Sequence, residues 1–291
     1  MIVLEAGAAR ALVALDGAEI KEWEVSGRPL LWQADPSVWP ETAPLLFPVV
    51  GWTRGGQVRV GGKTYPLGLH GFARSRRFEL MEQERGRVRL QLVSDAGTRA
   101  LYPFDFALTI EHRLSEHALE TVMEVANAGR EPMPYACGVH PGFRWPFAGG
   151  MAEDYRIVFA EPEDRNVPDI APGGFITHHK HELPLDGRIL PLDAQLFEND
   201  AQCFLNARSR GLRFVAPNGA SISLETENFP HLALWCSPGH GFLCLEAWTG
   251  YSDPEDFTGN LFAKPSMRVL APGNSARHVA RFSYDSAAPG D

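Results

Sequence analysis

Hydrophobic and polar residues alternate along much of this chain, most clearly between residues 106 and 126. The apolar side chains fall on Phe106, Leu108, Ile110, Leu114, Leu119, Met123 and Val125. The alternate positions carry Thr109, Glu111, Glu120 and Glu124. A period of two residues places all the apolar side chains on one face of a strand. The pattern therefore predicts a half-buried hairpin of two strands of about ten residues each, with its turn at 115–118.

Similar alternation predicts six further strands, at 87–93, 155–159, 212–215, 221–225, 267–270 and 278–284. Glycine and proline pairs separate these segments, and no amphipathic helix of three or more turns stands out. The 28 glycines and 23 prolines are spread evenly, as in a chain of many strands joined by turns. We therefore predict an all-β protein, a large antiparallel β-sandwich or barrel.

The 291 residues suit one large all-β domain or two ordinary domains. No linker rich in proline, glycine and serine divides the chain, and no repeat of fixed period is visible. We therefore expect a single domain over residues 1–291, with 286–291 as a loose tail. The hydrophobic fraction of 44% is enough for a substantial core.

Charge and cysteine usage exclude several functional classes. The chain has 36 acidic and 27 basic residues and no long basic run, so we expect no nucleic-acid partner. It shows no signal peptide and no run of roughly 18 apolar residues, so we expect no membrane association. The four cysteines are scattered without a C-x-x-C pair, which argues against a disulfide framework or a zinc ribbon. Reduced thiols in a cytoplasmic protein are the simplest interpretation.

One segment, CGVHPGFRWPF at 137–147, places a single histidine, His140, among glycines, prolines and three aromatic rings. We expect this segment to be a loop at the end of a strand. Proline restricts the backbone and glycine permits tight turns, so the loop would hold the imidazole rigidly. A histidine held in this way is either a structural turn residue or a group that moves a proton near neutral pH. The second role requires a partner elsewhere in the chain.

Glu246 is the best candidate for that partner, because it interrupts an otherwise apolar strand that begins at Phe242. Burying a carboxylate is costly unless it is hydrogen-bonded or paired. Burial would also raise its pKa from about 4.3 toward the range of a general base at neutral pH. The alternative is that Glu246 is an exposed residue on the polar face of the strand, and the pattern alone does not decide between the two.

Four motifs occur in order along the chain: GLHGFAR at 68–74, GVHPGF at 138–143, FENDA at 197–201 and LCLEAWTGYSDPEDF at 243–257. Together with the segment LFPVVGWTRGG at 46–56, they resemble the aldose 1-epimerase (mutarotase) family, in particular its bacterial LacX-like branch. The resemblance extends over nearly the whole chain. It implies a large antiparallel β-sandwich that interconverts the α and β anomers of a free hexose or hexose derivative. It also implies that the reaction needs neither a metal nor another cofactor.

By the same resemblance, Glu246 is the general base that removes the proton from the C1 hydroxyl, and His140 is the general acid that protonates the ring oxygen. His70 and Arg74 match positions that bind the sugar, and Arg54 occupies the place of an arginine that follows the Val-Gly pair. Asp200 matches an aspartate that binds sugar hydroxyls, although Glu198 or Asn199 takes this role if the register slips. Trp235, Trp248 and Phe143 are candidates either for a wall that stacks on the sugar ring or for ordinary core aromatics.

Two charged segments have alternative interpretations. Arg76 and Arg77 either begin a solvated strand or bind an anionic group such as a 6-phosphate or 6-sulfonate on the sugar. The run HHKHE at 178–182 resembles a metal-binding tract, but it lacks a second cluster of ligands, so we expect a solvated loop.

Two other functional classes compete with the epimerase. A carbohydrate-binding sandwich without catalysis would not need the acid–base pair of His140 and Glu246. A glycoside hydrolase or lyase on a similar sandwich would normally use two carboxylates on either side of the scissile bond. The strongest pair here is one carboxylate and one histidine, which favours the epimerase.

Overall fold

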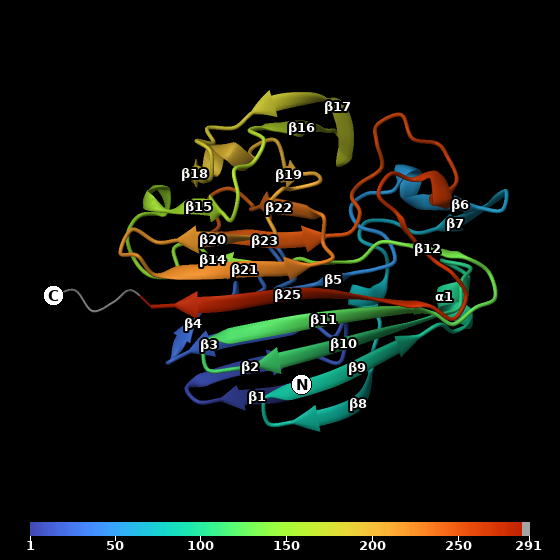
Figure 1. Ribbon diagram of the computed structural model, residues 1–291, viewed down its shortest axis with the longest axis horizontal. Helices are drawn as coiled ribbons and strands as arrows, with labels where there is room; N and C mark the ends of the chain where they lie inside the picture. The colour runs from blue at the N-terminus through green and yellow to red at the C-terminus, as the bar shows by residue number, and fades with distance from the viewer. Residues whose placement is uncertain (287–291) are drawn as a thin grey trace.

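The computed structural model describes residues 1–286, and nearly all of its regular structure is antiparallel β-sheet (Figure 1). The single α-helix in this range is the one-turn α1 (Ala96–Arg99). Five short 3-10 helices complete the helical content: η1 (Arg54–Gly56), η2 (Ala73–Ser75), η3 (Ala152–Asp154), η4 (Ala194–Phe197) and η5 (Leu261–Ala263). None of the helices in residues 1–286 is long and apolar enough to cross a membrane. The prediction of an all-β protein is confirmed.

The larger sheet has nine strands in the order β18-β15-β20-β21-β25-β11-β10-β9-β8. Their bounds are β18 (Ile189–Pro191), β15 (Arg156–Phe159), β20 (Gly211–Val215), β21 (Ser221–Glu227), β25 (Ser275–Asp285), β11 (Ala118–Asn127), β10 (Phe106–Leu114), β9 (Arg87–Val93) and β8 (Glu79–Glu84). The hairpin predicted from the alternation is β10–β11, in which Phe106 pairs with Asn127 and Leu114 pairs with Leu119. Its apolar side chains are buried, so the predicted face is the core face.

The second main sheet has the order β19-β22-β23-β13-β5, with β14 also paired to β23. The strands are β19 (Gln202–Phe204), β22 (His231–Trp235), β23 (Phe242–Trp248), β13 (Gly138–Val139), β5 (Leu45–Leu46) and β14 (Gly142–Arg144). Aromatic contacts join the two sheets: the rings of Phe143 and Phe282 lie 5.2 Å apart, and those of Phe159 and Phe204 lie 4.6 Å apart. The two sheets therefore pack face to face as a sandwich.

Four smaller sheets border the sandwich. They are formed by β1 (Ile2–Ala6), β2 (Ala9–Val13), β3 (Ile20–Val25) and β4 (Arg28–Pro29), by β6 (Gln57–Val60) and β7 (Lys63–Pro66), by β12 (Met133–Tyr135) and β24 (Arg268–Leu270), and by β16 (Asn166–Ala171) and β17 (Phe175–Glu182). The β16–β17 hairpin projects from the molecule beyond β19 and β22 (Figure 1). It is the element that covers the site described below.

Two segments expected to be loops contain strands instead. The stretch 137–147 forms β13 and β14, which pair with β23 on either side of the interruption at His140 and Pro141. The run 178–182 lies in β17, where cross-strand pairing with β16 holds polar residues in an extended conformation although most of their side chains are exposed. Of the tail predicted at 286–291, residues 287–291 lie outside the described residues.

Candidate active site

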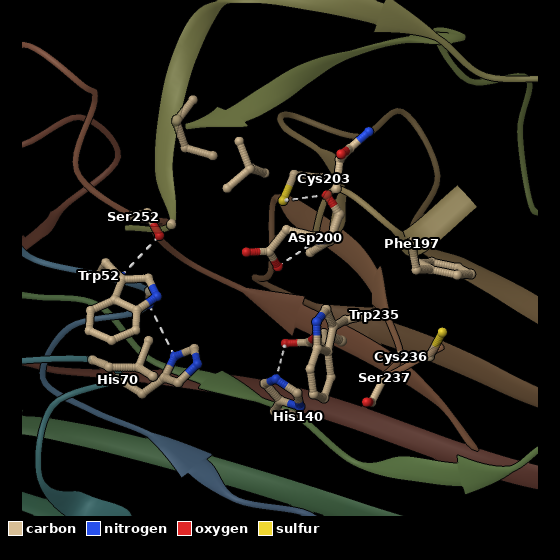
Figure 2. A pocket seen from close by; sticks show the side chains of 18 of the residues that line it. Trp52, His70, His140, Phe197, Asp200, Cys203, Trp235, Cys236, Ser237 and Ser252 are labelled. Atoms are coloured by element: carbon tan, nitrogen blue, oxygen red, sulfur yellow. Dashed lines mark hydrogen bonds and ion pairs between the residues drawn. The ribbon is translucent and has the colours of Figure 1, made fainter. Parts of the chain in front are cut away.

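A cleft of about 860 Å³ lies over the six-stranded sheet, and residues from all the motifs of the sequence analysis line it (Figure 2). β22 and β23 supply its floor, and the turn of the β16–β17 hairpin forms one wall. The lining residues that carry polar or aromatic chemistry include Trp39, Glu41, Trp52, His70, Arg74, His140, Phe197, Glu198, Asn199, Asp200, Trp235, Ser237, Glu246, Trp248 and Ser252. Such a concave site with convergent polar groups is typical of small-molecule binding.

The centre of the cleft is a contact between His140 and Glu246. The Nε2 atom of His140 lies 3.2 Å from Oε2 of Glu246, and Trp248 donates a hydrogen bond of 3.0 Å from its indole nitrogen to the same oxygen. The pairing of β13 with β23 aligns Val139 with Ala247, which brings His140 beside Glu246. Glu246 is only 1% exposed, so the interpretation as an exposed strand residue is wrong. Because both contacts use Oε2, Oε1 remains available for a ligand.

Glu246 lies in β23, a strand in which every residue is buried. A strand covered on both faces consists mainly of apolar residues. A carboxylate within such a strand requires a polar partner that hydrogen-bonds to it. Burial raises the pKa of the Glu246 carboxyl well above its usual value, and the Trp248 hydrogen bond opposes this shift in part. Burial also lowers the pKa of His140 to about 3. Both shifts favour the uncharged form of each residue. We therefore describe Glu246 and His140 as one unit that shares a single titratable proton.

The other ring nitrogen of His140, Nδ1, is buried and has no hydrogen-bond partner among the described residues. Leaving a buried polar atom unpaired costs about 1–3 kcal/mol. Such unsatisfied atoms are rare in native structures, and a catalytic role is one of their established explanations. The environment of His140 is therefore unlike that of an ordinary core histidine.

His70 adds a hydrogen-bond donor to the cleft. The backbone N–H of Gly51 donates to Nδ1 of His70 over 3.1 Å, so the proton of the neutral ring is on Nε2. Burial holds the pKa of His70 well below its usual value, with smaller effects of the same sign from His140 and Arg74. His70 has a left-handed φ of 60°, a strained conformation that is common at functional sites.

Arg74, on η2, lines the cleft as expected but already has an acidic partner. Its guanidinium donates to Oε2 of Glu41 at 2.7 Å and to the carbonyl oxygen of Leu69 at 3.3 Å. Burial raises the pKa of Glu41, whereas Arg74 lowers it. Sequence reasoning missed Glu41, because it belongs to no motif and reaches Arg74 only through the folding of a distant loop.

Asp200 lies in the loop between η4 and β19, and its carboxylate points into the cleft (Figure 2). The backbone N–H of Ala201 donates to Oδ1 of Asp200 over 2.7 Å, and burial raises the pKa of the carboxyl. The φ of Asp200 is 91°, far from the usual range of an L-residue. Glu198 and Asn199 also line the cleft, so the structure is compatible with each of the three predicted contacts.

Aromatic rings surround the histidine. The ring of Trp39 lies 5.2 Å from that of His140, and the ring of Trp235 lies 5.9 Å from it. Trp235 and Trp248 line the cleft as predicted, whereas Phe143 packs in the core against Trp23 and Phe282. Trp39 was missed because the sequence around it resembles no motif.

The structure does not bring the remaining predicted arginines into the cleft. Arg54 donates to the carbonyl oxygen of Phe257 over 3.1 Å, and its guanidinium lies 4.9 Å from the centre of the Phe175 ring. Arg77 is exposed and pairs with Asp16 at 3.4 Å, and Arg76 lies over the ring of Phe72. Of the residues that line the cleft, Arg74 is the only arginine or lysine.

A family model described as "Aldose 1-epimerase" matches residues 1–283 of this chain. The chain belongs to the aldose 1-epimerase family. It is 30% identical over 277 residues to the chromosomal LacX protein of Lactococcus lactis, with 89% of each chain covered. The family resemblance in the sequence is thereby confirmed, and membership of the family makes the protein an isomerase with a sugar substrate.

Solved structures of epimerase relatives share the sandwich. A galactose mutarotase related enzyme from Lactobacillus acidophilus superposes with a TM-score of 0.90 at 27% identity, covering 98% of this chain and 97% of that chain. A galactose mutarotase-like protein from Lactobacillus casei gives the same TM-score and identity, covering 98% of this chain and 100% of that chain. The predicted galactose mutarotase-like sandwich is confirmed.

Proposed function

We propose that the protein interconverts the α and β anomers of a free, uncharged aldose, with Glu246 as general base and His140 as general acid. The observation that carries this proposal is the 3.2 Å contact between His140 Nε2 and Glu246 Oε2 inside the cleft. The two oxygens that exchange protons in anomerisation, O1 and O5, are bonded to the same carbon. An acid and a base that act on them must therefore lie close together, as these two residues do.

The reaction needs one proton to leave O1 and one to reach O5. Glu246 takes the proton of the C1 hydroxyl, and the electrons of this O–H bond form the C1 carbonyl. At the same time the C1–O5 bond breaks, and O5 takes a proton from His140. The aldehyde turns about the C1–C2 bond, and closure on its other face reverses both transfers. Each transfer contributes typically 10²–10⁴-fold in rate.

The single proton of the pair is enough for this cycle. With the proton on His140, Glu246 is a carboxylate, which accepts the Trp248 hydrogen bond and has Oε1 available for the sugar hydroxyl. A hydroxyl donated to that oxygen would stabilise the carboxylate further. Sugar binding would therefore shift the proton toward His140 and prepare the pair for reaction.

The rest of the cleft suits sugar hydroxyls. His70 offers an N–H donor, Arg74 offers its remaining guanidinium protons, and Asp200 offers an acceptor. Trp39 and Trp235 provide apolar faces on which the C–H face of a sugar could stack. Glu41 neutralises the charge of Arg74, and further carboxylates line the cleft. The charge of the cleft as a whole therefore favours an uncharged sugar over a 6-phosphate or 6-sulfonate.

The test is polarimetry or NMR on freshly dissolved α-galactose and α-glucose, each compared with its 6-phosphate. We expect the protein to accelerate anomerisation of the neutral sugars well above the rate in buffer, and to act less efficiently on the phosphates. Rates equal to those in buffer for every sugar would support a carbohydrate-binding protein instead. Equal efficiency on phosphorylated sugars would refute the preference for an uncharged substrate.

A further inference from the structure

A hydrogen-bonded chain behind the cleft connects the β16–β17 hairpin to the loop that carries Asp200. His181 lies on β17. Its Nδ1 atom is 2.7 Å from Oδ1 of Asp169 on β16, and its Nε2 atom is 2.8 Å from Oε1 of Gln202 on β19. None of these three residues lines the cleft, and the mechanism above does not use them.

The direction of each bond follows from the chemistry of the partners. The amide nitrogen of Gln202 donates to the carbonyl oxygen of Leu196, so the amide oxygen faces His181. The carboxylate of Asp169 can only accept. Both ring nitrogens of His181 therefore face acceptor oxygens.

Gln202 closes the base of the loop 196–202, since its side chain spans from the start of β19 back to Leu196. Gln202 is buried, and the residues between the two ends of this clamp include Asp200. Behind the loop lies a second cavity of about 510 Å³, lined by Asp169, His181 and Gln202 among others. Asn199 and Ala201 border both cavities, so this part of the loop is a thin wall, whereas Phe197 is buried against Trp145.

The strained backbone of Asp200 makes this clamp important. A non-glycine residue with a φ of 91° keeps that conformation only when its surroundings impose it. Within the loop, the N–H of Asp200 donates to the carbonyl oxygen of Phe197 over 3.2 Å, and the N–H of Ala201 donates to Oδ1 of Asp200. Because cavity lies on both sides of the loop at Asn199 and Ala201, the hydrogen bonds of Gln202 add the restraint that ties this loop to its surroundings. We propose that His181 is a positioning residue for the sugar: it holds Gln202, and through Gln202 it fixes Asp200 in the orientation that binds a sugar hydroxyl.

This proposal rests on the proposed function, in which Asp200 binds the substrate away from the reacting bonds. The test compares His181→Ala with His179→Ala, each with and without Asp200→Ala. His179 lies on the same strand and is exposed, which makes it a matched control. Anomerisation kinetics separate KM from kcat, and circular dichroism confirms that each variant folds. The conservative variant His181→Gln, which can still donate to Gln202, is measured as well.

We expect His181→Ala to raise KM about tenfold with kcat changed less than threefold, as for a loss of binding shared by ground and transition states. His181→Gln should recover part of this loss, and His179→Ala should match the wild type. In the Asp200→Ala background, His181→Ala should change KM less than twofold, because the residue it positions is gone. A full additional loss in that background would overturn the proposal, as would a His181→Ala enzyme indistinguishable from His179→Ala.

Binding of galactose, followed by tryptophan fluorescence, keeps the two proposals distinguishable. If the wild type binds galactose without anomerising it, the proposed function fails, and a tenfold rise in Kd for His181→Ala still supports the positioning role. An unchanged Kd in that case refutes the positioning role. If the wild type neither binds nor converts any sugar of the panel, both proposals are wrong.

Discussion

The most informative substitution in this protein is Glu246→Gln. Glutamine has nearly the shape of glutamate, so it leaves no cavity in β23, and its amide oxygen can accept the 3.0 Å hydrogen bond from Trp248. What it lacks is the ability to take a proton from the C1 hydroxyl. General base catalysis is worth about 10²–10⁴-fold, which corresponds to roughly 3–5 kcal/mol in the barrier at 1.36 kcal/mol per tenfold. We therefore expect kcat to fall at least about 100-fold.

The same substitution should leave the fold intact or stabilise it. Burial raises the pKa of Glu246 in the folded protein above its value in the unfolded chain. The folded state then binds this proton more tightly, so the wild type has its full stability below the unfolded pKa and loses it as the pH rises toward the folded pKa. Glutamine does not titrate, so the stability of the variant relative to the wild type should increase with pH from about 4.5 upward.

Two measurements check this reasoning together: polarimetric kcat with galactose, and urea unfolding at pH 5 and pH 8. A kcat within threefold of the wild type would show that Glu246 is not the base. A large loss of stability at pH 8 would show that the ionised carboxylate is stabilised by the fold, contrary to the burial argument. Activity lost with stability retained is the result that we expect.

Three further substitutions test other parts of the site and the core. His140→Asn should lower kcat at least about 100-fold with little change in the unfolding midpoint, because it removes the proposed acid; near-normal turnover would assign that role elsewhere. Glu41→Gln removes the charged partner of Arg74. The ratio of kcat/KM for galactose 6-phosphate to kcat/KM for galactose should then rise about tenfold, which is the effect of one charge at several ångströms. An unchanged ratio would contradict the charge argument. Burial lowers the pKa of His112 to about 4, so this residue makes stability fall by up to about 1.4 kcal/mol per pH unit as the pH drops from 6.5 toward 4. His112→Gln should flatten that decline in urea titrations, and an unchanged slope would show that His112 is not responsible.

Alternation along the chain predicted the β10–β11 hairpin and several further strands, and the resemblance to the family supplied the candidate site residues. The β10–β11 hairpin follows from alternation alone, because a two-residue period leaves one face to bury. The family motifs carry His70, Arg74, His140, Asp200 and Glu246, and all five line one cleft. The hairpin could be predicted because it depends on residues close together in sequence, whereas the site residues followed from the resemblance to the family.

The tertiary structure decided everything that depends on contact between distant segments. Glu246 is buried because the folded protein covers β23 on both faces. The residues next to Glu246 in the sequence do not determine this burial. The pairing of Glu41 with Arg74 joins residues 33 positions apart, and Arg54 turns to Phe257 rather than to the cleft. The alternation of side chains along the sequence thus determined the β10–β11 hairpin and the face that it buries. Long-range packing alone determined which charges meet and which are removed from water, because both depend on the spacing of elements brought together only by folding.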